Sequence, residues 1–281
     1  MSAECSSDII DLALAEDIGS GDITSQCFVT PDRQARAMIV ARCECVLAGV
    51  SVAAEVFRRV DPGLQIQVLR KDGDSLDAGD IALRIEGRAG PILTAERTAL
   101  NFIQRLSGVA TLASTYVSAV AGTGVKILDT RKTTPGMRTL EKQAAAAGGA
   151  TNHRIGLYDM AMVKDNHLSA AGSVDSLREG IARLKSLHPG VKLEVEVDTI
   201  DQLREVLALD GVDVVLLDNM SLTMLREAVA IRKPGVLLEA SGGVTLETIG
   251  AIAATGVDFI SVGAITHSAA AADFALDFQE E

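Results

Sequence analysis

The chain has 281 residues, of which 48% are apolar and 23% charged, and its formal net charge is −12 at pH 7. This length allows one large α/β domain, or one such domain with a smaller partner. The acidic balance argues against a nucleic-acid-binding protein, which needs a broad basic face. Tryptophan is absent and aromatic residues make up 3% of the chain, which favours helices packed on a parallel sheet over an aromatic-rich sandwich.

The first residues, MSAECSSDIID, contain no basic segment followed by an apolar run. No later stretch approaches the roughly 18 apolar residues of a membrane span, so we expect neither secretion nor membrane insertion. Four cysteines lack the spacing of metal ligands: Cys5, Cys27, Cys43 and Cys45. We interpret them as reduced thiols of a cytoplasmic protein.

The first third of the chain predicts a small α+β domain. Residues 8–17 have apolar positions at helical spacing, and short β-like runs separated by turn dipeptides fill residues 35–93, with one helix at 49–60. Helical spacing returns over residues 94–121, where Gly108 is expected to divide two helices and to mark the domain boundary. Nothing before Arg97 indicates catalysis.

The rest of the chain alternates β-rich runs with amphipathic helices. The expected strands are 125–129, 161–164, 192–197, 213–218, 235–241 and 258–263, and the expected helices are 138–147, 174–187, 200–209, 222–232 and 246–254. This alternation predicts parallel βα units, and apolar strands such as VVLL predict a sheet covered on both sides. We expect an N-terminal open-faced α/β sandwich (1–108), an incomplete α/β barrel (109–267), and a tail (268–281) that packs back on the first domain.

Every expected strand ends in polar residues or glycine. The ends are Asp129-Thr130-Arg131-Lys132, Lys164-Asp165-Asn166, Glu196, Asp218-Asn219, Ser241-Gly242-Gly243 and Gly263. In an α/β barrel these ends share one mouth, where such barrels place their chemistry. An open doubly wound sheet would gather ligands only at its switch point. Six such ends favour the barrel, which is expected to be incomplete because only six strands are clear.

The window from Arg97 to Lys164 holds nine basic residues against three acidic ones. Guanidinium and ammonium groups at strand ends suit carboxylates and phosphates, although each could also belong to a solvated rim. Lys164 could instead form a Schiff base if its pKa were lowered. The turns at Ser241-Gly242-Gly243 and at Gly263 could bring backbone amides to a phosphate, or could simply be tight βα turns.

Two carboxylates lie at neighbouring strand ends. Glu196 and Asp218 could hold ribose hydroxyls or a Mg²⁺ ion shared with pyrophosphate, and otherwise would be solvated strand ends. Glu194 is expected to have a structural role, paired with a lysine. Of the histidines, His153 is a candidate ligand contact, and His267 could reach a phosphate.

The assembled motifs resemble those of the quinolinate phosphoribosyltransferase (decarboxylating) family, also called nicotinate-nucleotide pyrophosphorylases. They extend over nearly the whole chain: AEDIGSGDIT, AERTALNFIQRLSGVAT, DTRKTTPGMR, GGATNHRIGLYD, VKDNH, EVEVD, LLDN, SGG and VGAITHS. The combination of DTRKTTPG, NHR and KDNH at these spacings is specific. The resemblance implies the fold expected above and a role in NAD biosynthesis, in a homodimer or a hexamer.

The resemblance implies a reaction in which quinolinate and phosphoribosyl pyrophosphate give nicotinate mononucleotide, pyrophosphate and CO₂, with Mg²⁺ required. It implies a quinolinate site formed by Arg97 from the neighbouring subunit and by Thr130, Arg131, His153, Arg154 and Lys164. It implies a phosphoribosyl pyrophosphate site formed by Lys132, Glu196, Asp218, Asn219, Ser241, Gly242, Gly243, Gly263 and His267. Lys132, Lys164, Glu196 and Asp218 are the expected catalytic residues, and Glu196 and Asp218 are the expected metal ligands.

Three alternatives remain open at this point. A paralogue on the same scaffold, of the molybdenum-transport-associated type, could have a changed substrate. Lys164 could serve a Schiff-base lyase, which borohydride trapping would detect. A non-catalytic anion-binding protein is disfavoured because Glu196 and Asp218 would then repel the ligand.

Overall fold

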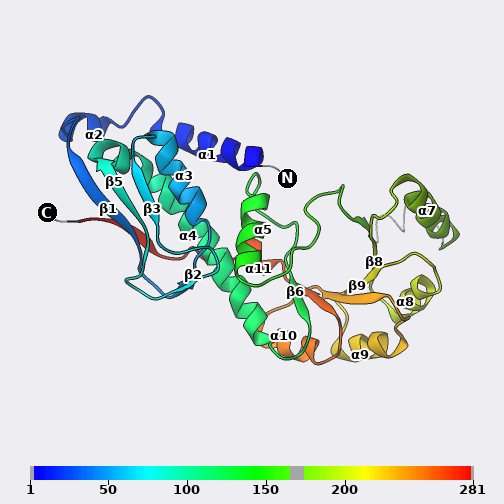
Figure 1. The fold of residues 1–281 in the computed structure, drawn as a ribbon. Coiled ribbons are helices and arrows are strands. Elements are labelled where there is room, and N and C mark those ends of the chain that lie inside the picture. The colour runs from blue at the N-terminus through cyan, green and yellow to red at the C-terminus, as the bar shows by residue number, and fades with distance from the viewer. Residues whose placement is uncertain (1–2, 165–173, 280–281) are drawn as a thin grey trace. The chain divides into compact units, whose positions relative to one another are not determined.

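The computed structural model describes residues 3–164 and 174–279, and the chain divides into two compact units (Figure 1). Unit 1 contains residues 1–114, 132–149 and 264–281, and unit 2 contains residues 115–131 and 150–263. Each unit is therefore built from segments that are separated in the sequence. The expected α/β class, with a sheet domain followed by a parallel βα domain, is confirmed.

Unit 1 is organised around an antiparallel sheet with strand order β12-β1-β5-β3. Its strands are β1 (Gln34–Ala41), β3 (Gln65–Val68), β5 (Ile81–Arg88) and β12 (Phe274–Phe278), and a separate pair joins β2 (Cys45–Val46) to β4 (Ser75–Leu76). Ile39 faces Leu83 across β1 and β5, and neither side chain is exposed. Arg36 and Glu86 face each other on the opposite side of the same two strands, where both are exposed. The sheet thus has one buried and one open face, as expected of an open-faced sandwich.

Among the described residues, five helices or helical turns lie wholly within unit 1. They are α1 (Ala3–Ile18), α2 (Ile23–Phe28), α3 (Val50–Val60), α5 (Arg138–Ala147) and α11 (Ala264–His267). Helix α3 buries Val50, Ala53, Val56 and Phe57 and packs on β3 and β5. The short helix α2 was not expected from the sequence. Its N-cap is Asp22, which accepts a hydrogen bond from the Ser25 amide at 2.9 Å.

One continuous helix, α4 (Ala89–Ala119), contradicts the expected division at Gly108. Gly108 lies inside this helix, at a point where another segment of unit 1 passes close to the helix backbone. A Cβ atom at Gly108 would lie 1.9 Å from the carbonyl oxygen of Ala270. Glycine is therefore required here because it lets the two backbones pass close to each other. It does not mark a turn or a helix end.

Gly108→Ala is expected to destabilise unit 1, because the Ala270 backbone must move away from the new methyl group. Overpacking of this kind costs about 1–3 kcal/mol. The matched control is Gly180→Ala in α7 (Val174–Leu187), where a Cβ would meet nothing within 4 Å. That change should instead stabilise its helix by roughly 0.5–1 kcal/mol. Urea unfolding of both variants measures the difference, and equal effects would contradict this explanation.

Unit 2 is organised around a six-stranded parallel sheet with order β6-β11-β10-β9-β8-β7. All six expected strands are confirmed: β6 (Lys126–Leu128), β7 (Ala161–Val163), β8 (Leu193–Val197), β9 (Val214–Asp218), β10 (Leu237–Ser241) and β11 (Phe259–Ser261). β6 and β7 are the two edges of this sheet, so the barrel is open there, as expected. In β9, Val215 and Leu217 are fully buried and Leu216 is 5% exposed, which confirms cover on both sides.

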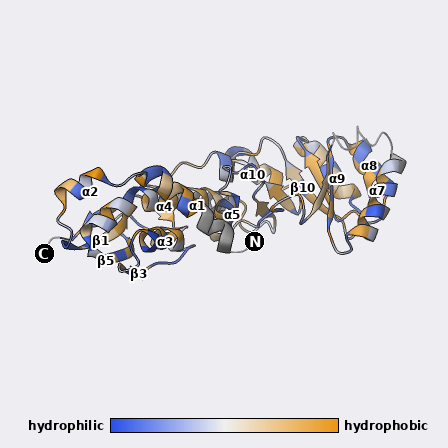
Figure 2. Cartoon of the chain, turned by 90° about the horizontal axis from the view of Figure 1, so that it is seen from above, coloured by the Kyte–Doolittle hydropathy of each residue, from blue (hydrophilic) through white to orange (hydrophobic). Residues whose placement is uncertain are grey.

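Three further helices follow the strands of unit 2 and begin at capping residues: α8 (Ile200–Leu207), α9 (Leu222–Ile231) and α10 (Leu246–Ala253). A capping box of Thr199 and Gln202 is present at the start of α8. Hydrophobic residues are concentrated in the strands around β10 (Figure 2).

Acidic residues at the amino edge of the parallel sheet tie neighbouring strands together. Asp213 accepts a hydrogen bond from the Leu193 amide at 2.7 Å, and Asp258 accepts one from the Leu238 amide at 2.8 Å. Lys185 and Arg232 pair with these two carboxylates at 3.3 and 2.9 Å. The amino edge therefore carries structural contacts, which leaves the carboxyl edge for chemistry.

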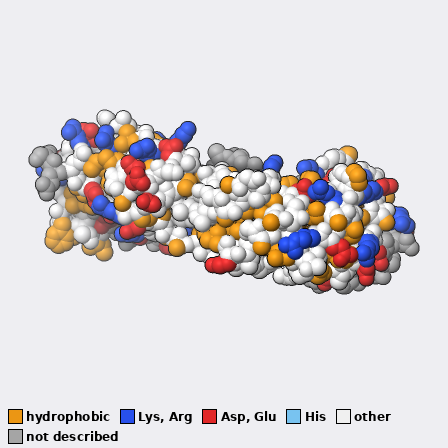
Figure 3. Space-filling model, turned by 90° about the horizontal axis from the view of Figure 1, so that it is seen from below, with side chains coloured by type: hydrophobic (Ala, Val, Ile, Leu, Met, Phe, Trp, Pro, Cys, Tyr) orange, Lys and Arg blue, Asp and Glu red, His pale blue; other side chains and the backbone are white. Residues whose placement is uncertain are grey.

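The C-terminal strand β12 pairs antiparallel with β1, with Phe274 opposite Ala41 and Phe278 opposite Ala37. Residues 264–281 thus belong to unit 1, and unit 2 begins at residue 115. No helix in the part of the chain that the structure describes is long and apolar enough to span a membrane. On the face drawn in Figure 3, basic and acidic side chains are interspersed.

Candidate active site

The carboxyl edge of the parallel sheet carries most of the residues predicted to form the site. Because all six strands run in the same direction, the residues that end them lie at one edge. Within unit 2 these residues are Thr130, Arg131, Lys164, Glu196, Asp218, Asn219, Ser241, Gly242, Gly243 and Gly263. Residues 165–168 of the VKDNH motif lie outside the described residues.

Lys164 follows β7 directly, and its ammonium lies 2.8 Å from Oε2 of Glu196 on the neighbouring strand β8. The Lys164 side chain is 44% exposed and that of Glu196 is 13% exposed. The pair is open to solvent, so a ligand with carboxylate or phosphate groups could exchange with Glu196 as the partner of the ammonium.

Asp218 and Asn219 end β9 in an unusual backbone conformation. Asn219 has a φ of 52°, and its side-chain amide donates to Oδ2 of Asp218 at 2.8 Å. Its backbone amide donates to the Ser241 carbonyl at 2.9 Å, which ties the end of β9 to the end of β10. The left-handed conformation of a non-glycine residue is a strained feature that such contacts must hold in place.

Gly242 leaves room for Asn219. A Cβ at Gly242 would lie 2.2 Å from Oδ1 and 2.9 Å from the backbone nitrogen of Asn219, and the φ of Gly242 is +92°. The turn Ser241-Gly242-Gly243 then leads to α10, whose N-cap is Thr245. Two consecutive left-handed glycines precede this helix, and the amides of a helix N-terminus favour an anion such as a phosphate.

Gly242→Ala is expected to lower kcat/KM roughly 100-fold, because it displaces Asn219 and the neighbouring Asp218 by an ångström or more. Gly190→Ala is the matched control, because Gly190 precedes β8 at the amino edge of the sheet, outside the proposed site. Its φ is also +92°, but a Cβ there would meet nothing within 4 Å. The control should cost only about 1–2 kcal/mol of stability and retain activity. Steady-state kinetics of the two variants decide the matter, and equal losses of activity would show that sterics at Asn219 are not the cause.

His153 contacts two buried glutamates on the inner face of the sheet. Its Nε2 lies 3.1 Å from Oε2 of Glu194 on β8 and 3.4 Å from Oε2 of Glu239 on β10. These side chains are 6%, 0% and 2% exposed. The prediction that a lysine pairs with Glu194 is therefore wrong, since the lysine Lys164 pairs with Glu196 and Glu194 faces His153.

The residues beside His153 are held by Asp129, which is fully buried at the end of β6. Its carboxylate accepts hydrogen bonds from the Asn152 side chain at 2.6 Å and from the His153 amide at 2.8 Å. The Leu128–Thr151 bridge attaches the same segment to the edge of the sheet. The buried Asp129 thus holds the Asn-His-Arg segment in place through the Asn152 side chain and the His153 backbone amide.

Electrostatic repulsion among cations is evident at Arg154. Burial, together with the positive charge of Arg131, lowers the pKa of its guanidinium, while Glu194 and Asp159 oppose that shift. An anionic ligand beside Arg154 would offset the effect of burial and of Arg131 on its charge, so this place suits an anion.

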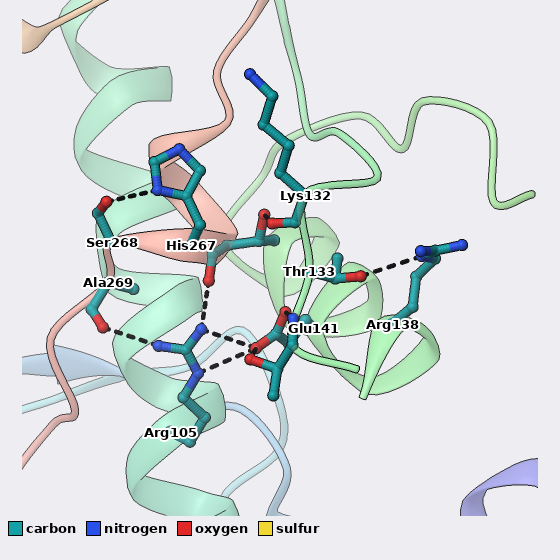
Figure 4. A network of polar contacts seen from close by, with 10 residues as sticks. Arg105, Lys132, Thr133, Arg138, Glu141, His267, Ser268 and Ala269 are labelled. Carbon is teal, nitrogen blue, oxygen red and sulfur yellow. Dashed lines mark hydrogen bonds and ion pairs between the residues drawn. The ribbon is translucent and has the colours of Figure 1, made fainter. Parts of the chain in front are cut away.

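Three predicted site residues belong to unit 1: Arg97, Lys132 and His267. Arg97 is exposed on α4. The Lys132 carbonyl accepts a hydrogen bond from Thr266 Oγ1 at 2.8 Å, and Nδ1 of His267 lies 2.6 Å from Ser268 Oγ (Figure 4). The 132–149 segment is thereby attached to the 264–281 segment within the same unit.

A buried ion pair that the sequence did not reveal supports this part of unit 1. Glu141 on α5 is fully buried and accepts from Nε and Nη2 of Arg105 on α4, at 3.0 and 2.8 Å (Figure 4). It also accepts from the Thr134 amide at 3.0 Å and the Thr134 hydroxyl at 2.7 Å. Arg105 donates to the carbonyls of Thr266 and Ala269 as well. One arginine thus fixes the loop that bears Lys132 and the turn that bears His267.

Two sets of residues in unit 2 could hold a divalent cation. Glu196 and Asp218 are carboxylates at the ends of adjacent strands, and oxygen donors with open surroundings suit Mg²⁺, which keeps waters and substrate phosphates as ligands. The ligand atoms of His153, Glu194 and Glu239 all lie within 4.8 Å of one another. This second set is enclosed and is occupied by its own ion pairs.

Comparison with known proteins places most of the chain in one family. The model of the quinolinate phosphoribosyl transferase N-terminal domain matches residues 22–107, and that of the C-terminal domain matches residues 109–277. The chain is 44% identical over 277 residues to the nicotinate-nucleotide pyrophosphorylase (carboxylating) of Mycobacterium leprae (strain TN), with 96% of each chain covered. It is 42% identical over 289 residues to the chloroplastic enzyme of that name from Arabidopsis thaliana, covering 97% of this chain and 82% of the plant protein. The structure of the nicotinate-nucleotide pyrophosphorylase from Francisella tularensis is 40% identical, with a TM-score of 0.92 over 99% of this chain and 98% of that one.

Proposed function

Because the chain belongs to the quinolinate phosphoribosyl transferase family, we propose that it transfers the phosphoribosyl group of phosphoribosyl pyrophosphate to quinolinate with decarboxylation. The products are nicotinate mononucleotide, pyrophosphate and CO₂, and the protein is a pentosyltransferase of NAD biosynthesis. One observation carries the proposal: cations and carboxylates share the carboxyl edge of a single parallel sheet, with Lys164 2.8 Å from Glu196.

The quinolinate dianion is proposed to bind to Arg131, His153, Arg154 and Lys164, with the backbone at Thr130. Two carboxylates need several cations to offset their own desolvation and repulsion. Burial and the positive charge of Arg131 lower the pKa of Arg154, which supports this role, since the dianion would offset both effects. The ion pair of Lys164 with Glu196 suits an ammonium that binds anions and gives no support to a Schiff-base lyase.

Phosphoribosyl pyrophosphate is proposed to bind through Lys132, Glu196, Asp218 and His267, with Asn219 and the Ser241-Gly242-Gly243 turn, and with Gly263. The left-handed turn before α10 supports a phosphate position. Mg²⁺ is the proposed cofactor, held by Glu196 and Asp218. When bound, it would offset the negative charge of the leaving pyrophosphate.

The chain's own groups act by charge and position. As pyrophosphate departs, the ribose carbon gains positive charge, which the Glu196 and Asp218 carboxylates are placed to stabilise. Lys132 would stabilise the departing negative charge, and its backbone is held by Thr266. Loss of CO₂ would leave the bonding electron pair on the ring carbon next to the quaternised nitrogen, whose positive charge stabilises it, and a proton from solvent would then take the place of the carboxylate. The decarboxylation therefore requires no protein nucleophile.

A homodimer is the proposed assembly, because Arg97 would reach quinolinate from a neighbouring subunit. Its exposed position on α4 supports that role. The proposed compartment is the cytoplasm. Free thiols at Cys27, Cys43 and Cys45 support a reducing environment.

The test of function is direct. Purified protein incubated with quinolinate, phosphoribosyl pyrophosphate and Mg²⁺ is expected to release CO₂ and nicotinate mononucleotide in equal amounts. Omitting any one of the three should abolish both products. Absence of nicotinate mononucleotide from the complete mixture would refute the proposed reaction.

A further inference from the structure

The turn between Arg154 and β7 is fixed by a carboxylate that has no part in the proposed binding roles. Both oxygens of Asp159 accept hydrogen bonds from the backbone: Oδ2 from the Ile155 amide at 2.7 Å and Oδ1 from the Gly156 amide at 2.9 Å. The Tyr158 ring lies over the same turn, since a Cβ at Gly156 would lie 2.4 Å from it. These contacts hold the residues that directly follow Arg154, so they restrict the backbone from which its side chain extends.

The Arg154 side chain crosses this turn. Its Nη1 donates to the Met160 carbonyl at 3.3 Å, and its Nη2 lies 3.3 Å from Sδ of Met162 on β7. A guanidinium carries more N–H donors than these two contacts use, so they orient the group and leave donors for a ligand. Because Asp159 directly precedes Met160, its contacts with the backbone hold together the two chain segments that the guanidinium bridges.

The segment is also held on the side before Arg154. Asp129, fully buried at the end of β6, accepts from the Asn152 side chain at 2.6 Å and from the His153 amide at 2.8 Å. Each of these contacts again uses a different carboxylate oxygen. The residues on both sides of Arg154 are therefore fixed by an aspartate, Asp129 from within the sheet and Asp159 from within the turn.

We propose that Asp159 is a positioning residue of the quinolinate site, which together with Asp129 fixes the backbone around Arg154 and so orients its guanidinium before the substrate binds. This inference rests on the proposed function, in which Arg154 binds a carboxylate of quinolinate. A donor that is already oriented binds a carboxylate more tightly, because less conformational freedom is lost on binding.

Position and charge predict opposite effects for Asp159. Its negative charge opposes the lowering of the pKa of Arg154, so the charge is felt at the guanidinium. If charge were its only influence, removing it would strengthen the binding of a dianion. If Asp159 acts by position, removing it must weaken binding, because the turn loses its hydrogen bonds to Ile155 and Gly156. Asp159 is exposed, so solvent screens its charge, and we expect the effect of position to be larger.

The experiment measures binding without turnover. Benzene-1,2-dicarboxylate carries two carboxylates on adjacent ring carbons, as quinolinate does, but has no ring nitrogen to accept a phosphoribosyl group. Calorimetric titration of the full chain is expected to give a Kd about tenfold higher for Asp159→Ala than for the wild type. Asp159→Asn keeps one acceptor oxygen and should restore part of the affinity. In kinetics, the KM for quinolinate should rise by a similar factor, while the KM for phosphoribosyl pyrophosphate should stay unchanged.

Asp213→Ala is the matched control. Asp213 also accepts from a backbone amide, that of Leu193 at 2.7 Å, and pairs with Lys185 at 3.3 Å. It lies at the amino edge of the same sheet, away from the proposed site. The Kd for benzene-1,2-dicarboxylate and both KM values should therefore equal those of the wild type. Circular dichroism of each variant shows that the fold is retained.

The outcomes separate this inference from the proposed function. An unchanged or lower Kd in Asp159→Ala would overturn the inference, since the carboxylate would then act by charge or not at all. Equal weakening by Asp213→Ala would also overturn it, because a general loss of stability would then be the cause. A wild type that does not bind benzene-1,2-dicarboxylate would contradict the position assigned to Arg154. A wild type that binds it but forms no nicotinate mononucleotide would refute the reaction alone, and the Kd values would then decide the role of Asp159.

Discussion

Lys164→Ala is expected to lower kcat/KM for quinolinate roughly 30- to 1,000-fold, equivalent to about 2–4 kcal/mol of lost transition-state stabilisation. The ammonium follows β7 directly and lies beside Glu196, so its loss removes a positive charge from a region that must hold several negative ones. The Lys164 side chain is 44% exposed, and the change should therefore leave the fold intact. Steady-state kinetics and circular dichroism measure both effects.

Lys185→Ala is the matched control for this prediction. Lys185 pairs with Asp213 at 3.3 Å and is 39% exposed, so its environment resembles that of Lys164. It lies at the amino edge of the same sheet, where the contacts are structural. Normal activity is expected, with at most about 1 kcal/mol of lost stability. Near-normal kcat/KM in Lys164→Ala would remove the basis of the charge argument.

Arg105→Leu is expected to destabilise unit 1 by about 3–5 kcal/mol, because it leaves a buried carboxylate without its cation. Glu141 has no solvent exposure, and only its hydrogen bonds with Thr134 would remain among the contacts described above. The backbone carbonyls of Thr266 and Ala269 would lose a donor at the same time. Activity should fall as well, since this arginine holds both the Lys132 loop and the turn at His267.

Chemical denaturation followed by far-ultraviolet circular dichroism measures this loss. The control is Arg204→Leu, because Arg204 pairs with Glu227 at 2.8 Å but both side chains are about half exposed, at 55% and 46%. An exposed pair of this kind contributes about 0–1 kcal/mol. Equal destabilisation by the two changes would show that burial of Glu141 is not the deciding factor.

The parallel sheet of unit 2 could be predicted almost strand by strand. Its strands are short apolar runs such as Val214–Leu217, and each is separated from the next by an amphipathic segment or a long loop, so local pattern and tertiary environment agree. The predicted helices 138–147 and 174–187 match the bounds of α5 and α7. Once the strands are known to be parallel, it follows that the polar residues at their carboxyl ends lie at one edge of the sheet.

Features that depend on contacts between distant segments could not be predicted. Gly108 was interpreted as a helix boundary because glycine is a common breaker, yet its reason is the carbonyl of Ala270. The Arg105–Glu141 pair joins helices α4 and α5, and no local pattern in the sequence indicates that these two residues meet. Glu194 was paired with a lysine because a buried carboxylate needs a cation, and the sequence did not show which distant segment reaches it. In the structure His153, in the loop between α5 and β7, lies next to Glu194.

Residues 274–278 pair with the first strand of the chain. A ribosome must therefore synthesise the residues up to Phe278 before the sheet that begins with β1 can acquire its last strand. During translation, β1 retains an unpaired edge, the kind of surface on which nascent chains associate wrongly. A premature stop codon before Phe274 would make that edge permanent, and it would affect residues 37–41, more than 200 residues earlier in the sequence.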